Sequence, residues 1–271
     1  MNQEIKDHLY ANLEKVAIVT DPFPYFYMRD MLPAQYYEKL TAGLPVNDSY
    51  DRFPAPYESR LGLDLSAKTL DKFPEGGRAI WQEFEAWIHS QEFLDKITAK
   101  FQPFLDVNAA YRKEQLKKAA TGPSTVRIEP RSLLVRDYSN FAISPHTDSG
   151  SKTMVGAFYL PKDEAQKPFG TSFYRARNPS FTDWDSERFE YADFEVAYTA
   201  EYVPNSMLFF MKCDHSFHGV EQREYSNTGR DVLFWTPAIA GKQITDKPLS
   251  LPTELFLKKG GFLNQVKKLF A

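Results

Sequence analysis

The spacing of hydrophobic positions divides the chain near residue 124. Before that point, apolar side chains recur every three to four residues, most clearly over residues 80–101, as on a helix with one buried face. A further helix is predicted over residues 34–44, after a short extended run at residues 21–33. The first part of the chain is therefore predicted to be rich in helix.

After residue 124 the pattern changes to short apolar or alternating runs. Turn-forming residues such as Pro130 and Gly170 separate these runs. Short strands at this spacing predict an antiparallel sandwich or closed barrel of the jelly-roll kind, and helices followed by strands predict an α+β, mainly β chain whose helices buttress one sheet. The expected strands cover residues 125–128, 133–138, 154–160, 171–174, 198–203, 206–211 and 232–236.

This change of pattern does not mark a domain boundary, and we expect one domain over residues 1–271. Within it we expect a helix-rich N-terminal support at 1–124, a jelly-roll core at 125–240 and a C-terminal segment at 241–271.

Two stretches depart from the rhythm of the strands. Residues 161–197 form a long connection in which aromatic and acidic residues alternate loosely, and both a lid and a solvated excursion remain open for it. Residues 252–271 have the pattern of a basic amphipathic helix, for which we expect docking on its own domain rather than on a membrane or a partner.

Charge and composition exclude several classes of protein. With 33 basic and 36 acidic residues the net charge is -3, which gives no global field for gripping nucleic acid. No apolar run approaches the roughly 18 residues that span a bilayer, and the first residues lack the apolar segment of a signal peptide, so we expect a cytoplasmic protein without a membrane span. The single cysteine, Cys213, excludes an internal disulfide and is expected to be a buried bystander.

Histidine and aspartate residues of the central region suggest a metal site. In a β-strand alternate side chains project to the same side, so His146 and Asp148 can chelate one ion, with His218 as a third ligand. Two imidazoles and one carboxylate can occupy one face of an octahedral Fe(II) and leave the opposite face for substrate and dioxygen. The same donors also serve catalytic zinc. His215 competes with His218, because both follow the apolar run at residues 207–211.

Arg230 begins the apolar run over residues 229–237, and we expect it to be a cation at the mouth of a buried strand. A buried guanidinium needs a counter-charge, and its planar fork suits a carboxylate that is held bidentately. The sequence leaves open whether this carboxylate belongs to the protein or to a bound molecule.

The order His146-x-Asp148, His218, Arg230 on a predicted jelly roll resembles the iron(II)- and 2-oxoglutarate-dependent dioxygenases, in particular their prolyl-4-hydroxylase-like branch. The resemblance implies a double-stranded β-helix, or cupin-like, core in which the two histidines and the aspartate hold Fe(II). It favours His218 over His215, because the residues after His218 and its spacing to the arginine match the family. Other stretches similar to the family are residues 21–33, 133–138, 159–161 and 170–171.

The resemblance also implies the co-substrate and the reaction. Arg230 would bind the distal carboxylate of 2-oxoglutarate beside Tyr159, with Tyr138 as a weaker candidate for the same pocket and ascorbate as a candidate reductant. Relatives that halogenate lack the carboxylate at the position of Asp148, so its presence favours hydroxylation of a C–H bond with release of succinate and carbon dioxide. The family's glycine-rich turn is reduced here to residues 169–170, a change of loop shape rather than of chemistry.

The substrate is not specified by the sequence beyond a peptidyl, amino-acid or other small-molecule target. Arg136, Lys152 and residues 181–194 are candidates to line the outer pocket, although Lys152 is also typical of a solvated turn. The alternatives are a jelly-roll metal protein with zinc-type hydrolase activity or with a non-catalytic ligand-binding role. Arg230 with Tyr159 argues against a zinc hydrolase, which has no evident reason to place these side chains beside its metal.

Overall fold

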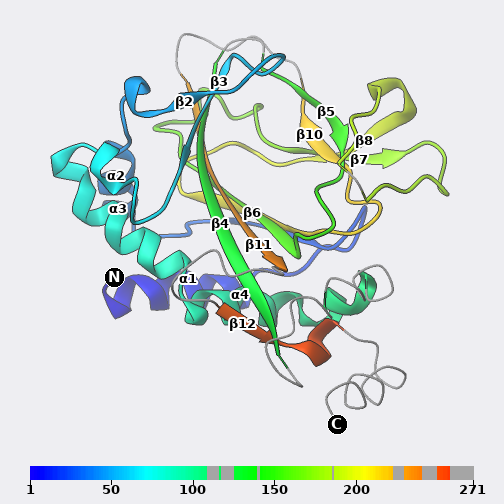
Figure 1. Cartoon of the computed structure of the whole chain (residues 1–271), viewed down its shortest axis with the longest axis horizontal. Helices are drawn as coiled ribbons and strands as arrows, with labels where there is room; N and C mark the ends of the chain where they lie inside the picture. The colour runs from blue at the N-terminus through cyan, green and yellow to red at the C-terminus, as the bar shows by residue number, and fades with distance from the viewer. Residues whose placement is uncertain are drawn as a thin grey trace.

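The computed structural model describes residues 1–108, 116, 125–138, 141–184, 186–221, 229–239 and 249–256. In this part of the chain the helices come first and the long strands later (Figure 1). The α-helices are α1 (Gln3–Lys15), α2 (Ala34–Ala42), α3 (Glu75–Ile88) and α4 (Gln91–Phe101). Short 3-10 turns are η1 (Asn47–Ser49), η2 (Leu70–Lys72), η3 (Gln102–Asn108), η4 (Tyr191–Asp193) and η5 (Thr253–Phe256).

Two antiparallel sheets make the chain mainly β. The larger sheet has the order β1 (Tyr25–Arg29), β9 (Ser206–Met211), β6 (Met154–Tyr159), β11 (Arg230–Ile239), β4 (Thr125–Asp137), β3 (Arg60–Asp64) and β2 (Asp51–Arg52), and β12 (Leu249–Pro252) also pairs with β4. The smaller sheet has the order β5 (Ile143–His146), β10 (His218–Val220), β7 (Ser172–Ala176) and β8 (Phe194–Thr199). From β4 to β11 the chain passes repeatedly between the two sheets.

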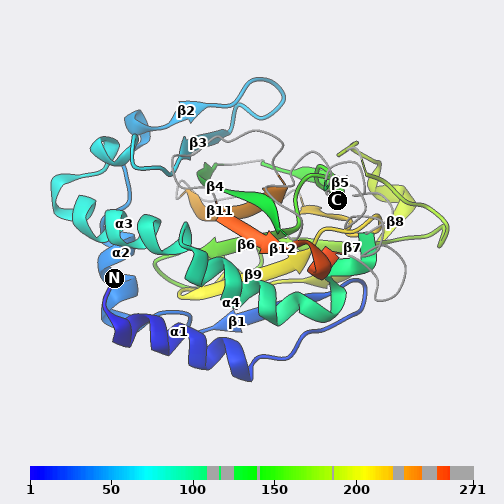
Figure 2. The same cartoon turned by 60° about the horizontal axis from the view of Figure 1, so that its bottom comes forward.

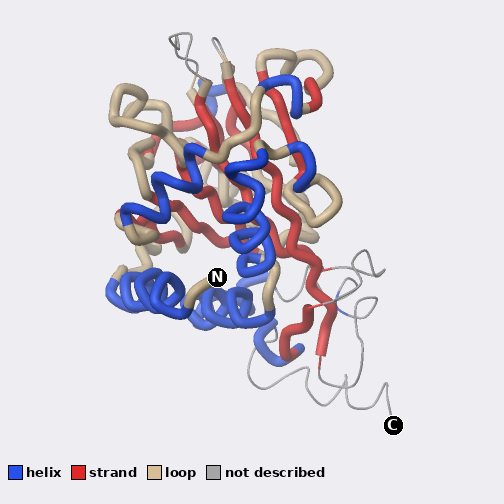
Figure 3. Tube along the Cα trace, turned by 90° about the vertical axis from the view of Figure 1, so that its left-hand side faces the viewer, coloured by secondary structure: helices blue, strands red, loops and turns tan. Residues whose placement is uncertain are grey.

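The central strands β6 and β9 are buried at every position, because the larger sheet is covered on both faces, and all their side chains except Ser206 are apolar or absent. One face packs on the helices, for example through Trp235 of β11 against Phe93 of α4, with ring centroids 5.1 Å apart. Figure 2 shows α1 and α4 along this side of the sheet, and Figure 3 shows the helices gathered on one side of the strands. The inner face packs against the smaller sheet, as where Phe210 of β9 contacts Phe173 of β7 with ring centroids 5.2 Å apart.

The structure corrects several predicted boundaries. The sequence predicts two strands at residues 125–128 and 133–138, but the structure has the single strand β4 there. Pro130 does not end the strand, because it lies directly opposite Pro237 of β11. Proline has no backbone N–H to donate, and because the two prolines are paired, the lost hydrogen bonds fall at the same position of the sheet. The strand therefore continues past Pro130, although a proline usually ends a strand. The strand predicted at 198–203 is instead β8, Phe194–Thr199, which shortens the long connection.

The predicted helix over residues 80–101 is two helices, α3 and α4. Ser90 ends the first and caps the second, since its hydroxyl accepts a hydrogen bond from the amide of Phe93 at 3.2 Å. The apolar pattern is too short or too weak to predict α1, β2, β3 and β12.

Two expectations concern the ends and the extent of the fold. No helix in the described ranges is both long and apolar enough to cross a bilayer. Of the predicted C-terminal helix over 252–271, only residues 252–256 are described, as the end of β12 and η5, and the rest lies outside the described residues. A single domain over residues 1–271 stays a proposal.

Candidate metal centre

The structure brings His146, Asp148 and His218 together. His146 ends β5, His218 begins β10, and the two residues are direct partners in the antiparallel register, with ring centroids 4.3 Å apart. Oδ2 of Asp148 lies 3.3 Å from Nε2 of His218. One ligand atom from each of the three residues lies within 4.8 Å of the others. The expectation that His146 and Asp148 share a strand is wrong, because β5 ends at His146 and Asp148 follows it.

Each imidazole is oriented by a backbone carbonyl. Nδ1 of His146 lies 3.0 Å from the carbonyl oxygen of Ser144, and Nδ1 of His218 lies 3.0 Å from that of Ser216. A carbonyl can only accept a hydrogen bond, so Nδ1 carries the proton and donates it. In the neutral ring Nε2 then presents its lone pair to the cluster, which is the arrangement typical of metal-binding histidines.

Burial and neighbouring charges set the protonation of the three ligands. Burial lowers the pKa of His146 well below its ordinary value, and the nearby His218 adds to this effect. Burial also lowers the pKa of His218. Burial by itself raises the pKa of Asp148, but Lys152 and the two histidines outweigh it and hold that pKa below its ordinary value. Neutral imidazoles and an ionised carboxylate are the states that bind a metal ion.

The donor set fits Fe(II). Two imidazole nitrogens and one carboxylate oxygen form the 2-His-1-carboxylate set, which leaves positions on the ion open for other ligands. Lys152 holds the carboxylate in place, with its Nζ 2.6 Å from Oδ1 of Asp148. The other oxygen, Oδ2, is the one that lies beside His218. Lys152 is therefore part of the site and not a solvated turn residue.

His215 belongs to a separate group. Its Nδ1 lies 2.6 Å from Oδ1 of Asp214, and its Nε2 lies 3.7 Å from the thiol of Cys213. The side chain of His215 is 49% exposed, whereas that of His218 is 11% exposed. The geometry thus joins His218, and not His215, to His146. Cys213 is buried, as predicted.

Arg230 is fully buried at the start of β11. Its Nη1 donates a hydrogen bond to Oδ2 of Asp137 at 3.0 Å, and its Nε donates to the carbonyl of Phe169. The guanidinium lies 5.8 Å from the ring centre of Tyr159 and 5.0 Å from that of Tyr202. The sequence left open whether the carboxylate that faces Arg230 belongs to the protein or to a bound molecule, and the structure shows that Asp137 of the protein is one such carboxylate.

Tyr159 connects this arginine with the strands of the metal ligands. The tyrosine is fully buried on the inner face, where its hydroxyl donates to Oγ1 of Thr171 at 3.0 Å and accepts from the amide of Thr171 at 3.1 Å. Thr171 leads directly into β7, where Phe173 is the register partner of His218. A continuous set of contacts therefore runs from Arg230 through Tyr159 to the strand pair that carries the triad.

Two other predicted pocket residues lie elsewhere. The hydroxyl of Tyr138 donates to Oδ1 of Asn47 at 2.7 Å, and Nε of Arg136 donates to Asp231 at 2.7 Å. Both side chains alternate with Asp137 and point to the helical side of the larger sheet, where Tyr138 packs against the large core cluster. The alternation of β4 thus separates them from Arg230, and the predicted roles of Tyr138 and Arg136 near the pocket lose their structural basis.

Hydrogen bonds hold the connection between β7 and β8 beside the candidate metal ligands. Thr147, between the ligands His146 and Asp148, donates its hydroxyl to Oδ2 of Asp183 at 2.6 Å. The amide of Phe189 donates to the carbonyl of Pro145 at 3.0 Å. Two hydrogen bonds thus hold this segment beside His146 and Asp148, although most of its described residues are exposed.

Aromatic packing adds to these anchors. The rings of Phe181 and Phe189 lie 5.6 and 5.9 Å from that of Phe217, the residue before His218. The exposed Arg188 follows in the same segment, and its Nε donates to the hydroxyl of Tyr57 at 3.2 Å. The positive charge of Arg188 contributes to the lowered pKa of both metal-site histidines. The sequence indicates this aromatic segment but not its contacts, because the partner residues are distant in sequence.

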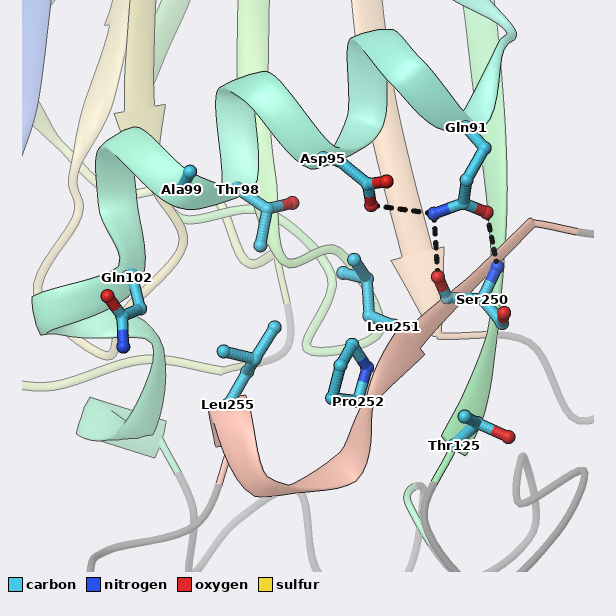
Figure 4. A pocket seen from close by; sticks show the side chains of 10 residues that line it. All are labelled: Gln91, Asp95, Thr98, Ala99, Gln102, Thr125, Ser250, Leu251, Pro252 and Leu255. Atoms are coloured by element: carbon cyan, nitrogen blue, oxygen red, sulfur yellow. Dashed lines mark hydrogen bonds between the residues drawn. The ribbon is translucent and has the colours of Figure 1, made fainter.

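A groove of about 590 Å³ lies between α4 and β12, on the helical side of the larger sheet (Figure 4). Gln91 spans it, since its amide donates to Asp95 at 2.7 Å and accepts from the amide of Ser250 at 3.0 Å. Its lining contains none of the metal-site residues, nor Arg230 or Tyr159. The groove therefore takes no part in the chemistry of the triad. The lining residues are Gln91, Asp95, Thr98, Ala99, Gln102, Thr125, Ser250, Leu251, Pro252 and Leu255.

No family model matches this chain, and no curated protein matches it in sequence. Among solved structures it is similar to a non-haem α-ketoglutarate-dependent carbocyclase from nogalamycin biosynthesis, with a TM-score of 0.46 and 11% identity over 89% of this chain and 85% of that chain. It is also similar to a prolyl-4-hydroxylase of Pseudomonas putida, with a TM-score of 0.46 and 11% identity over 86% of this chain and 97% of that chain.

A third similar structure is a prolyl hydroxylase from Trichoplax adhaerens in complex with a peptide fragment of the hypoxia inducible factor oxygen degradation domain. Its TM-score is 0.45, with 8% identity over 86% of this chain and 88% of that chain. These neighbours are of the kind that the sequence resemblance names. At such identities and scores, the case for a function rests on the side chains of the site.

Proposed function

We propose that this protein is an Fe(II)- and 2-oxoglutarate-dependent oxygenase that hydroxylates a C–H bond and releases succinate and carbon dioxide. One observation carries the proposal: the cluster of His146, Asp148 and His218, with both histidines buried, is connected through Tyr159 and Thr171 to the buried Arg230. The cluster offers the donors that suit Fe(II) with open positions. The arginine offers a guanidinium fork for a carboxylate in the protein interior.

The topology supports this proposal. In the larger sheet the core strands have the order β4, β11, β6, β9, and in the smaller sheet β5, β10, β7, β8. Eight strands divided in this way between two facing sheets are the order expected of a double-stranded β-helix, or jelly roll. We accordingly propose one catalytic domain in which the helices cover the outer face of the larger sheet and the triad occupies the inner side.

The three ligands would hold Fe(II) through Nε2 of His146, Nε2 of His218 and the carboxylate of Asp148. When bound, iron supplies with 2-oxoglutarate and dioxygen the oxidising chemistry that side chains lack. The chain's own contribution is orientation, because backbone carbonyls fix both imidazoles and Lys152 fixes the carboxylate. Burial lowers the pKa of both imidazoles and so favours their neutral, metal-binding form.

Arg230 and Tyr159 would hold the co-substrate at its distal carboxylate. The guanidinium is fully buried and cannot lose its proton in a protein, so it remains a fixed positive charge. The hydroxyl of Tyr159 is held in place by Thr171 and stays neutral, because burial raises its pKa. We propose a peptidyl, amino-acid or other small-molecule substrate on the side bordered by Lys152 and residues 181–194.

The test is the release of succinate from 2-oxoglutarate by the purified protein with Fe(II) and dioxygen. His146→Ala should abolish this release together with metal binding. Arg230→Ala should raise the concentration of 2-oxoglutarate required while metal binding survives. Equal succinate release by the parent and His146→Ala contradicts the iron site, and an unchanged 2-oxoglutarate requirement contradicts the role of Arg230. Hydrolysis with zinc and without 2-oxoglutarate would identify the protein as a zinc hydrolase instead.

A further inference from the structure

A second group of metal-binding side chains lies in the turn between β9 and β10. Cys213, Asp214 and His215 are consecutive in the sequence, and one ligand atom from each lies within 4.8 Å of the others. Sγ of Cys213 lies 3.7 Å from Nε2 of His215, and Nδ1 of His215 lies 2.6 Å from Oδ1 of Asp214. We call these three residues the 213–215 cluster. It shares no residue with the candidate iron centre.

The separation of Sγ and Nε2 suits two donors on one tetrahedral ion. Zn(II) binds a thiolate sulfur at about 2.3 Å and an imidazole nitrogen at about 2.0–2.1 Å, which places two such donors about 3.5 Å apart at a tetrahedral angle. The observed separation is 3.7 Å. The same two atoms share a hydrogen bond in this structure, so a bound ion would take the place of the proton between them with little movement of either side chain.

Asp214 orients the imidazole for this role. Its carboxylate accepts a hydrogen bond from Nδ1 of His215, which leaves Nε2 directed at the sulfur of Cys213. Histidines that bind metals typically donate their second ring N–H to a carboxylate in this way. The hydrogen bond with Asp214 and, to a smaller extent, that with Cys213 also raise the pKa of His215 to about 10. A position that holds a proton this firmly has a negative potential, which favours a cation as well.

The backbone holds the turn in one conformation. The hydroxyl of Ser216 accepts a hydrogen bond from the amide of Cys213 at 3.0 Å and donates one to the carbonyl of Cys213 at 2.8 Å. The amide of Asp183 donates to the carbonyl of Asp214 at 2.8 Å. The ligand atoms therefore have fixed relative positions, and binding an ion would cost little ordering entropy.

One ligand of the cluster lies inside the protein and the other faces solvent. Cys213 is 1% exposed, whereas the side chain of His215 is 49% exposed. Water can therefore complete the coordination of an ion from the outer side, as it does where the protein supplies fewer ligands than the ion takes. Cys213 is also the single cysteine of the chain, so a thiolate ligand can come only from this turn.

We propose that the 213–215 cluster is a second metal site, at which Cys213 and His215 bind Zn(II) or a cation of similar softness and Asp214 orients the imidazole. A thiolate favours such an ion over Mg(II) and Ca(II), which bind oxygen donors. The candidate iron centre contains no sulfur donor, so the two sites differ in the ions that they prefer. The proposal gives a role to the buried cysteine, and it does not depend on the function proposed above.

Titration with Co(II) tests the site, because Co(II) replaces Zn(II) in tetrahedral sites and a thiolate bound to it gives a charge-transfer absorption in the near ultraviolet. The parent protein and His146→Ala are titrated anaerobically. Both should show this absorption, since His146 belongs to the other cluster, and Zn(II) should remove it by displacing the weaker-binding Co(II). Cys213→Ser should lose the absorption, because it removes the sulfur donor.

Substitutions at the two partly exposed residues test the cluster even if Cys213→Ser does not fold. His215→Gln should weaken the Co(II) binding that produces the absorption by about tenfold or more, and Asp214→Asn should weaken it by about tenfold, because it removes the partner that orients the imidazole. His8→Gln is the matched control, since His8 lies on α1 and contacts the carbonyl of Asp30. It should leave the absorption and its dependence on Co(II) concentration unchanged.

Two results would overturn the proposal. One is a parent protein that shows no thiolate-to-cobalt absorption at any Co(II) concentration at which it stays folded. The other is an absorption that develops with the same affinity in His215→Gln as in the parent, because the thiol would then bind cobalt without the imidazole. Neither result affects the proposed oxygenase function, which is tested separately by the release of succinate.

Discussion

His146 and His218 face each other as register partners on β5 and β10, and each donates from Nδ1 to the backbone carbonyl two residues before it in the chain. The same local arrangement thus occurs twice, from opposite sides of one strand pair. It fixes the positions of both Nε2 atoms, so the metal binding that we propose would require little reordering of these rings. The site is preorganised by backbone geometry.

Loss of one ring should abolish metal binding. His146→Ala removes one of three ligand groups and should weaken the binding of Fe(II) or Co(II) by at least about a hundredfold, measured by anaerobic titration. His8→Ala is the matched control, because His8 lies on α1 and contacts the carbonyl of Asp30. Equal metal affinity in His146→Ala and His8→Ala would show that the cluster is not the metal site.

The anchor between Thr147 and Asp183 should control the segment that covers the site. Thr147→Val keeps the shape of the side chain but loses a charge-assisted hydrogen bond of 2.6 Å, at a cost of about 1.5–3 kcal/mol. Trypsin should then cleave faster after Arg177 and Arg188. Thr236→Val is the control, since its exposed hydroxyl makes a 3.4 Å hydrogen bond far from this segment in sequence. An unchanged cleavage rate in Thr147→Val contradicts the anchoring role.

Gly170 should be intolerant of any side chain. A Cβ at this position would lie 1.7 Å from the carbonyl oxygen of Ala200, a backbone atom that cannot move without shifting the chain beside β8. Gly170→Ala should therefore lower the free energy of unfolding by about 1–3 kcal/mol or more. Gly76→Ala in α3, where nothing lies within 4 Å of the added Cβ, should raise it by about 0.5–1 kcal/mol. Thermal unfolding checks both, and a similar effect of the two substitutions contradicts the close approach.

His215 should make stability depend on pH in alkaline solution. Its hydrogen bond with Asp214 and, to a smaller extent, its hydrogen bond with Cys213 raise the pKa of His215 from 6.5 to about 10. The folded protein then holds a proton that the unfolded chain releases, so this contribution is complete below pH 6.5 and disappears as the pH rises toward 10. Because the side chain is about half exposed, its value is at most about 1 kcal/mol.

Urea unfolding of the parent and of His215→Gln at pH 6 and pH 10 measures this contribution. The stability difference between the two proteins should be present at pH 6 and absent at pH 10. A difference that is the same at both pH values shows that the imidazolium of His215 makes no pH-dependent contribution.

Local patterns in the sequence were sufficient for part of the fold. The change from helical to strand periodicity near residue 124 is visible in the chain, since the spacing of apolar residues depends only on local geometry. The prediction that a strand ends near Pro130 is wrong because Pro237, its neighbour across the sheet, is more than a hundred residues away in the sequence. Only the strand pairing shows that the two prolines face each other and let β4 continue.

The site divides in the same way. The types and order of His146, Asp148, His218 and Arg230 could be read from the sequence, because the chemistry of metal and carboxylate binding restricts the residues that can perform it. The exclusion of His215, the hydrogen bond of Thr147 with Asp183 and the ion pair of Arg230 with Asp137 could not be read from it. These depend on register and alternation between strands distant in the chain, and only the assembled sheets fix which side chains share one buried face.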